Sequence, residues 1–248
     1  MFTVEQRDGV RDHVLTLAGK DKRVVAGAAV GSLALGDGDR FSDLDLTFAV
    51  ADDVAVAEVL EDWTRTLGAE LDAVQLVDVE RAPTIYRVFL LPNGLQFDLS
   101  LTPAARFAPA GPRFRLLFGR TAVGEERAPS PPAAADLFGW GVIYGLHARA
   151  CIERGRVWQA AHYIGAVRDH VLSLACLRRD LPAVQARGYD DLPANVLAGF
   201  EETHVANLEP QRLRSALSAA MRLLLHEGKQ SEVSSANAVA QRMRDPAT

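Results

Sequence analysis

Residues 31–47 of the chain read GSLALGDGDRFSDLDLT, and their pattern of glycines and acids indicates the fold. The apolar run RVVAGAAV, at residues 23–30, leads into this stretch and is typical of a buried strand. Because Gly31 lacks a Cβ, backbone N–H groups can approach an anion closely there, and the Ser32 hydroxyl can donate to the same anion. The stretch therefore predicts a strand that ends in an anion-binding turn.

Two acids follow in the same stretch, at the start of a second predicted strand, LDLTFAV at residues 44–50. Side chains alternate along a strand, so Asp43 and Asp45 are expected to project from one face while Leu44 and Leu46 point to the core. Neighbouring carboxylates repel each other, and divalent cations between them relieve the repulsion. Mg²⁺ prefers one or two carboxylates together with substrate phosphates. We therefore expect a magnesium site here, with two ions about 3.5–4 Å apart.

A third acid, Asp98, lies in the later stretch LQFDLSL at residues 95–101. Alternation gives this stretch an apolar face made of Leu95, Phe97, Leu99 and Leu101. Asp98 lies on the polar face, where an acid can ligate a metal or accept the proton of an attacking hydroxyl. Asn93-Gly94 separates this run from the apolar run 85–91, and Asn-Gly between apolar runs predicts a hairpin.

The composition changes at residues 128–135, APSPPAAA, which favours an extended linker over a packed element. Before this linker, helices are expected at 3–19 and 54–67, and a further strand at 71–79. After it the sequence predicts only helices, at 137–153, 157–181, 210–226 and 233–244, with breaks at Gly155 and Gly228. We therefore predict an α/β (α+β) domain with a mixed sheet over residues 1–128, followed by an all-α helical bundle over residues 129–248.

Composition excludes several classes of function. The net charge is −5, so the chain lacks the excess of Lys and Arg that nucleic-acid binding requires, and we expect no nucleic-acid partner. Two isolated cysteines, Cys151 and Cys176, suggest neither a disulfide framework nor a zinc site. The longest apolar run, 137–146, is half the length that a membrane span needs, and the N-terminus lacks a signal-peptide pattern. We expect a cytoplasmic protein with no membrane partner.

The motif as a whole resembles the nucleotidyltransferase superfamily that includes polymerase beta. The resemblance rests on Gly31-Ser32, a glycine four residues after the serine, the run SDLDL at 42–46, and the third acid Asp98 on a later strand. The small bacterial enzymes that adenylylate aminoglycosides and lincosamides are the closer resemblance, because they too carry a helical second domain. The motif covers residues 31–47 together with Asp98.

This resemblance implies transfer of a nucleoside monophosphate, AMP from ATP or its counterpart from another NTP, to a hydroxyl of a small molecule. An aminoglycoside or lincosamide is the expected acceptor, antibiotic resistance the expected consequence, and pyrophosphate the second product. Two Mg²⁺ ions are the implied cofactors. The implied metal-binding and catalytic residues are Asp43, Asp45 and Asp98. Gly31, Ser32 and Ser42 are expected to contact the nucleotide, which would lie between the two domains.

The general base stays open between Asp98 and a glutamate. Some drug-modifying members of the family use a glutamate near or in the helical domain as the base. Glu125 and Glu126 lie near the predicted boundary, although no motif ties them to that role.

In the helical domain, Arg168 lies within an apolar stripe of a predicted helix. The stripe consists of Val157, Ala161, Ile164, Val171 and Ala175. A buried charge needs a partner, so one interpretation is an internal salt bridge to an acid on a neighbouring helix. The other is a guanidinium that binds the triphosphate or the acceptor.

Trp158, His162 and Asp169 share the adjoining face of the same helix. Core packing is the simpler expectation for Trp158. The alternative is that an aromatic ring, a His and an Asp together form an acceptor site.

Two other functions stay open. Arg156 and His162, six residues apart, resemble the Arg…His pair of HEPN-type ribonuclease toxins, which accompany minimal nucleotidyltransferases as toxin–antitoxin partners. In that case the acceptor would be a protein or an RNA. The other alternative is a domain that binds nucleotide without catalysis, but the intact set of three acids argues against this.

Overall fold

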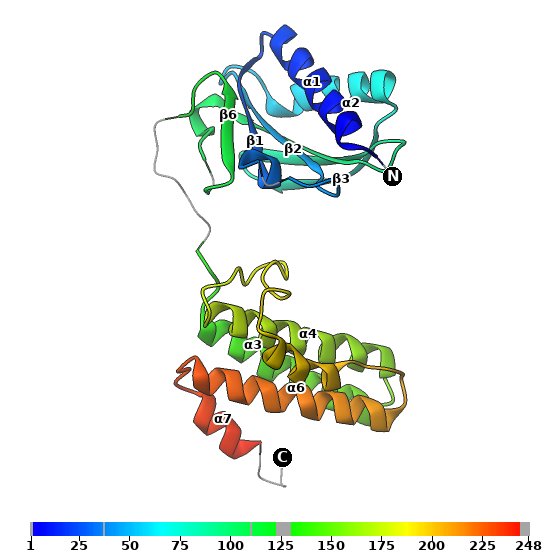
Figure 1. Cartoon of the computed structure of the whole chain (residues 1–248), viewed down its shortest axis with the longest axis vertical. Coiled ribbons are helices and arrows are strands. Elements are labelled where there is room, and N and C mark those ends of the chain that lie inside the picture. The colour runs from blue at the N-terminus through cyan, green and yellow to red at the C-terminus, as the bar shows by residue number, and fades with distance from the viewer. Residues whose placement is uncertain (1, 37, 110, 123–129, 244–248) are drawn as a thin grey trace. The chain divides into compact units, whose positions relative to one another are not determined.

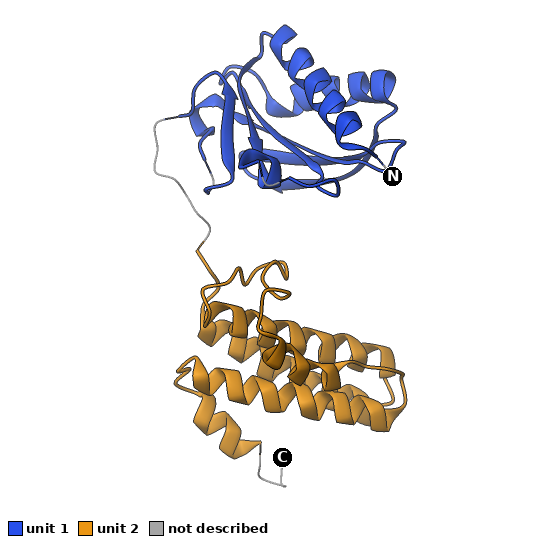
Figure 2. Cartoon of the chain, viewed as in Figure 1, with its two compact units in different colours: residues 1–129 blue, residues 130–248 orange. Residues whose placement is uncertain are grey.

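The computed structural model describes residues 2–36, 38–109, 111–122 and 130–243 (Figure 1). The chain divides into two compact units, residues 1–129 and residues 130–248, which Figure 2 shows in different colours. The division falls beside the boundary that the proline-rich stretch predicts. Each unit has its own hydrophobic core, as is typical of a domain.

Unit 1 contains a mixed sheet of six strands in the order β3-β4-β5-β2-β1-β6. The strands are β1 (Val24–Val30), β2 (Leu44–Val50), β3 (Val74–Arg81), β4 (Thr84–Leu90), β5 (Gln96–Pro103) and β6 (Phe114–Phe118). Neighbouring strands are antiparallel except for the central pair, β2 and β5, which is parallel. The parallel pair is the feature that matters for the site, because both strands start at the same edge of the sheet.

Two helices, α1 (Val4–Lys20) and α2 (Val56–Leu71), lie on the same face of this sheet (Figure 1). Their buried residues form one core with the apolar side chains of β2 and β5. Phe48 of β2 packs edge-on against Trp63 of α2, with ring centroids 5.2 Å apart. Since Leu44 and Leu46 face this core, alternation turns Asp45 to the opposite face of the sheet. The acids thus lie on the face that α1 and α2 leave uncovered.

Unit 2 is helical in all its described elements. They are α3 (Ala134–Glu153), α4 (Val157–Leu177), α5 (Ala194–Leu197), the 3₁₀ helix η3 (Ala198–Thr203), α6 (Pro210–Gln230) and α7 (Ala236–Arg242). Helices α3 and α6 approach closely at Gly141 and Gly145, where a Cβ would overlap Leu224 and Met221 of α6. No described helix is long and apolar enough to cross a membrane.

The predicted fold class is confirmed, and so is the hairpin at Asn93-Gly94. Leu91 N–H donates to Leu95 O at 2.9 Å, and Gly94 adopts a φ of +80°. The predicted break at Gly228 is wrong, because α6 runs through it to Gln230. A Cβ at Gly228 would overlap the ring of Phe138, so this glycine allows close packing against α3 and does not end the helix.

The structure also differs from the prediction in its set of strands and in the bounds of helices. The sequence prediction did not include β6, a short edge strand that pairs only with β1 among the described strands and whose local pattern does not alternate clearly. Helix α2 continues past its predicted end at Gly68 and stops at Asp72, which takes a left-handed conformation.

Candidate metal and nucleotide site

Three carboxylates converge at the edge where β2 and β5 start. Asp45 of β2 pairs directly with Asp98 of β5 in the parallel register, and Asp43 immediately precedes β2. Each residue offers one carboxylate oxygen, and these oxygens lie within 4.8 Å of one another. All three side chains are partly exposed. Carboxylate oxygens are the ligands that Mg²⁺ and Mn²⁺ prefer, so this donor set fits a hard divalent cation.

The electrostatics of Asp98 are those expected of such a cluster. Burial raises the pKa of Asp98, and the negative charge of Asp43 raises it further. The amide of Gln96 partly opposes these effects, because its Nε2 donates a hydrogen bond to Asp98 Oδ1 at 2.9 Å. Close carboxylates disfavour each other's ionised form, whereas a bound cation would favour it.

Gly31 lies against this cluster. It starts the 3₁₀ helix η1 (Gly31–Ala34) directly after β1, with a φ of +71°. A Cβ at this position would overlap Asp45 Oδ2. Two independent requirements therefore select glycine here: a left-handed backbone and the close approach of the Asp45 carboxylate. Ser32 follows in η1 and is partly exposed.

Replacing Gly31 with alanine is expected to disable the site. The left-handed backbone costs about 1–2 kcal/mol with any Cβ, and the added methyl group must also displace Asp45. Gly36→Ala is the matched control, since Gly36 has a φ of +82° but no described atom lies within 4 Å of where its methyl group would stand. The melting temperature of both variants should fall. Only Gly31→Ala should also bind Mn²⁺ more weakly in a titration. Equal Mn²⁺ binding by the two variants would contradict this interpretation.

No family model matches the sequence, and no curated protein matches it significantly. Among solved structures, an aminoglycoside 6-adenyltransferase from Bacillus subtilis is similar, with 14% identity, 92% of this chain and 90% of that chain covered, and a TM-score of 0.39. A nucleotidyltransferase-like protein from Exiguobacterium sibiricum has 14% identity, 92% and 79% coverage, and a TM-score of 0.40.

Ser42 closes a turn just before the acids. Its hydroxyl donates to Asp39 Oδ1 at 3.1 Å and accepts from Asp39 N–H at 3.0 Å. Asp39 also accepts from Phe41 N–H at 2.8 Å, and this bond, followed by that from Ser42, lowers the pKa of Asp39. The Ser42 hydroxyl thus has a local role in the turn, and its contact with a nucleotide stays a prediction.

In unit 2, Arg168 is one-quarter exposed and its Nε lies 3.5 Å from Asp169 Oδ1. This acid is its neighbour on α4, so the salt bridge is not the one expected to an acid on another helix. The role of Arg168 in nucleotide binding stays a prediction.

The expectation that Trp158 packs in the core is wrong, because its side chain is 78% exposed. Trp158 lies near the start of α4, and His162 and Asp169 of the same helix are also exposed. Their role as an acceptor site stays a prediction. Glu125 and Glu126 lie outside the described residues.

Helices α3 and α4 carry a row of aromatic and histidine rings, of which the sequence pattern indicated only His162. The rings belong to Trp140, Tyr144, His147, His162, Tyr163 and His170. Trp140 stacks on Tyr144 at 5.7 Å between ring centroids, and Tyr144 stacks on Tyr163 at 5.9 Å. The spacing of Trp140 and Tyr144, four residues apart on one helix, was the available signal.

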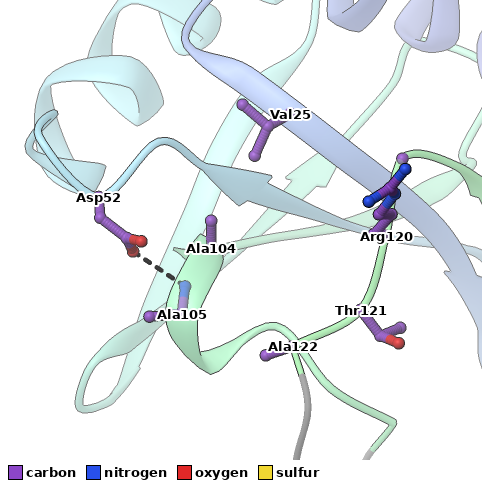
Figure 3. Close-up of a pocket in the computed structure, with 8 residues that line it drawn as sticks. Val25, Asp52, Ala104, Ala105, Arg120, Thr121 and Ala122 are labelled. Atoms are coloured by element: carbon purple, nitrogen blue, oxygen red, sulfur yellow. Dashed lines mark hydrogen bonds between the residues drawn. The ribbon is translucent and has the colours of Figure 1, made fainter.

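A separate hollow of about 640 Å³ lies at the opposite end of the central strands (Figure 3). Val25 at the start of β1 and Asp52 just after β2 line it, together with Arg120. Asp52 accepts a hydrogen bond from Ala105 N–H at 2.9 Å. Because β1 ends and β2 begins at the other edge, this hollow is not part of the acidic cluster.

Proposed function

We propose that this protein is a metal-dependent nucleotidyltransferase that moves a nucleoside monophosphate from an NTP, ATP being the expected donor, to a hydroxyl of a small molecule. The observation that carries the proposal is the convergence of Asp43, Asp45 and Asp98 beside the left-handed turn at Gly31. Three hard oxygen donors on one open sheet face suit Mg²⁺, which takes its remaining ligands from substrate phosphates and water. The motif resemblance of residues 31–47 supports the same chemistry.

In this proposal, the three acids hold the metal, which when bound would neutralise phosphate charge and increase the acidity of the attacking hydroxyl. The backbone at Gly31 and the hydroxyl of Ser32 bind the phosphates. The acceptor oxygen bonds to the α-phosphorus as the bond from that phosphorus to the bridging oxygen breaks, and pyrophosphate leaves. In this direct transfer no covalent bond forms between the substrate and the protein. Positioning of the reactants and stabilisation of charge would therefore account for most of the catalysis.

We propose that Asp98 accepts the proton of the acceptor hydroxyl. Asp98 belongs to the convergent set of carboxylates and is partly exposed, so its carboxylate can both bind the metal and accept this proton. Because Asp98 lies directly opposite Asp45, the two can bind the same metal ion. In this proposal, that ion is the one that activates the acceptor hydroxyl. Glu125 or Glu126 is the alternative base, by resemblance to drug-modifying members of the family.

The negative net charge of the chain favours a small-molecule acceptor over a nucleic acid. The chain has 32 acidic and 27 basic residues, so a cationic molecule such as an aminoglycoside would meet a favourable field. The motif resemblance points to aminoglycosides and lincosamides, and we propose these as the first acceptors to test.

The direct test is a screen of ATP, GTP, CTP and UTP against aminoglycosides and lincosamides with Mg²⁺, read by the mass gain of the acceptor and by pyrophosphate release. A mass gain of one nucleoside monophosphate supports the proposal. Labelling of a protein or an RNA without a small-molecule product would favour the toxin–antitoxin alternative. Binding of NTP without turnover on any acceptor would favour a domain that only binds nucleotide.

We also expect no measurable affinity for tRNA or DNA at physiological salt. Binding a polyanion requires clustered Lys and Arg that displace counterions, and the chain has a net charge of −5. Fluorescence anisotropy with labelled tRNA and duplex DNA, over a series of salt concentrations, checks this. Micromolar binding with a steep dependence on salt would contradict it.

A further inference from the structure

The positions of the three acids are fixed in different ways. Asp45 and Asp98 lie within paired strands, so the hydrogen bonds of the β2–β5 ladder set their backbone positions. Asp43 lies one residue before β2 and outside that ladder. Something other than strand pairing must therefore hold the Asp43 backbone in place.

The turn before Asp43 is closed by a compact set of hydrogen bonds. Ser42 N–H donates to Asp39 O at 3.3 Å, and the Asp39 carboxylate accepts from Phe41 N–H and from the Ser42 hydroxyl. These contacts fix the shape of the turn. They do not fix its position relative to the sheet, because all of them lie within the turn.

Arg7, in the first turn of α1, supplies the connection between the turn and the rest of unit 1. Its Nη1 donates to Asp39 O at 2.6 Å and to Ser42 O at 3.1 Å. The Ser42 carbonyl belongs to the peptide bond that carries the N–H of Asp43. One guanidinium nitrogen thus binds both ends of the turn, including the peptide unit of the metal-binding residue.

Arg7 is an unusual residue to find buried. It is only 3% exposed, and the acid beside it is Asp8, whose Oδ1 lies 3.8 Å from Nε. Its Nε has no hydrogen-bond partner among the residues that the structure describes. Burying a cation against backbone carbonyls is costly for stability, since a closely paired carboxylate would compensate the charge better. Because burying Arg7 in this way does not favour stability, its position suggests that it serves the site.

We propose that Arg7 is a positioning residue that holds Asp43 where it can share a metal ion with Asp45 and Asp98. The inference rests on the proposed function, because it assumes that the acids bind metal. Helix α1 is held against the sheet by Val10, Val14 and Ala18, which are buried in the same core as the apolar side chains of β2. Arg7 therefore connects the turn to a helix whose position relative to β2 is set by core packing.

The test is Mn²⁺ binding to the full-length protein without nucleotide, measured by electron paramagnetic resonance of free Mn²⁺. Arg7→Met is expected to weaken Mn²⁺ affinity about 10–100-fold, the usual effect of removing a group that orients a metal ligand. Arg7→Lys keeps the charge and should retain more affinity. Asp39→Ala opens the turn from its other side without changing α1 and should shift affinity in the same direction as Arg7→Met.

Arg11→Met is the matched control. Arg11 lies on the same helix, and its side chain bonds to the neighbouring acids Asp8 and Asp12 and not to the turn before Asp43. This variant is expected to bind Mn²⁺ like the wild type. A purely structural role for Arg7 would lower the melting temperature but leave the Mn²⁺ affinity of the folded protein unchanged.

The Mn²⁺ affinities of these variants separate the role of Arg7 from the proposed function. Wild-type affinity in Arg7→Met, beside a clear loss in Asp43→Asn, would overturn the role of Arg7 and leave the proposed function intact. If Arg7→Met does not fold, unchanged affinity in both Arg7→Lys and Asp39→Ala overturns the role instead. A wild-type protein that binds no Mn²⁺, with or without NTP, would overturn the proposed function and the role of Arg7 together.

Discussion

Replacing Asp45 with asparagine is expected to abolish nucleotidyl transfer while leaving the fold intact. Asp45 lies directly opposite Asp98 and close to Gly31, so in the proposed site it would take part in both metal and phosphate binding. Removing one preorganised electrostatic partner of a transition state commonly lowers kcat by about 10²–10³-fold, and a metal ligand should cost at least this. Turnover at saturating Mg²⁺, read by pyrophosphate release, measures the effect. Asp43→Asn should behave in the same way.

The metal-free protein is expected to gain stability from the same substitutions. Each removes one of three negative charges that lie within 4.8 Å of one another, and the asparagine side chain is nearly isosteric. The melting temperature without metal should therefore rise, and the stabilisation that Mg²⁺ gives the wild type should shrink.

Asp52→Asn provides the control, since Asp52 lies just beyond the opposite end of β2 and asparagine can still accept from Ala105 N–H. This variant should retain turnover. Near-wild-type turnover in Asp43→Asn or Asp45→Asn would remove these residues from the metal site.

Asp98→Asn is expected to cause a comparable loss of turnover, with nucleotide affinity largely kept. Ser32 and the other two carboxylates would still bind the triphosphate, whereas the acceptor would lose a metal ligand and a proton acceptor. A general base typically contributes about 10²–10⁴-fold. Pre-steady-state kinetics separates the chemical step from nucleotide binding. If Asp98 only ligates metal, turnover should fall at every pH; if it also accepts the proton, the acidic limb of the pH–rate profile should flatten.

The glutamates near the end of unit 1 supply the comparison for this prediction. A Glu125→Gln, Glu126→Gln double variant should retain most of its turnover if Asp98 is the base. An active Asp98→Asn beside an inactive double variant would show that the base is a glutamate.

Asp98→Asn should also change the pH dependence of stability. Burial and the charge of Asp43 raise the pKa of Asp98 in the folded protein, so the folded state binds the proton more tightly than the unfolded state does. Metal-free wild type therefore loses stability as pH rises from the ordinary pKa of 3.8 through the raised value. Asparagine cannot ionise, so the variant should be more stable than the wild type at neutral pH. This advantage should disappear at acid pH, where Asp98 is protonated. Thermal unfolding in a metal chelator between about pH 3 and pH 8 measures it, and an advantage independent of pH would contradict the assigned cause.

Much of unit 1 was predictable because its signals are local. The run LDLTFAV gives the bounds of β2, and Asn93-Gly94 gives the hairpin between β4 and β5. The alternation of the β5 sequence placed Asp98 on the polar face of the strand, since alternation depends only on neighbours along the chain. The same local rules placed Asp45 on the strand and Asp43 one residue before it.

Side-chain burial was less predictable from sequence. Trp158 was expected in the core although it lies on the face adjoining the apolar stripe, and it is 78% exposed, because α4 buries the stripe that contains Ile164, Val171 and Ala175. Gly228 has the pattern of a helix stop, yet it lies within α6, where Phe138 of α3 occupies the space of the missing side chain. In both cases the packing of neighbouring helices, which local sequence does not show, decided the outcome.

By itself, the sequence determined the chemical types and the order of the groups in the site: a glycine turn, a serine, two acids at the start of one strand and a third acid on a later strand. Only the tertiary structure decided that β2 and β5 are adjacent and parallel, which places Asp45 opposite Asp98, although the two lie 53 positions apart in the sequence. It also brought Arg7 from α1 to the turn before Asp43, at 2.6 and 3.1 Å from two carbonyl oxygens. The reason is physical: strand alternation and turn preference depend on neighbouring residues, whereas strand adjacency and the burial of a charge depend on how distant segments pack.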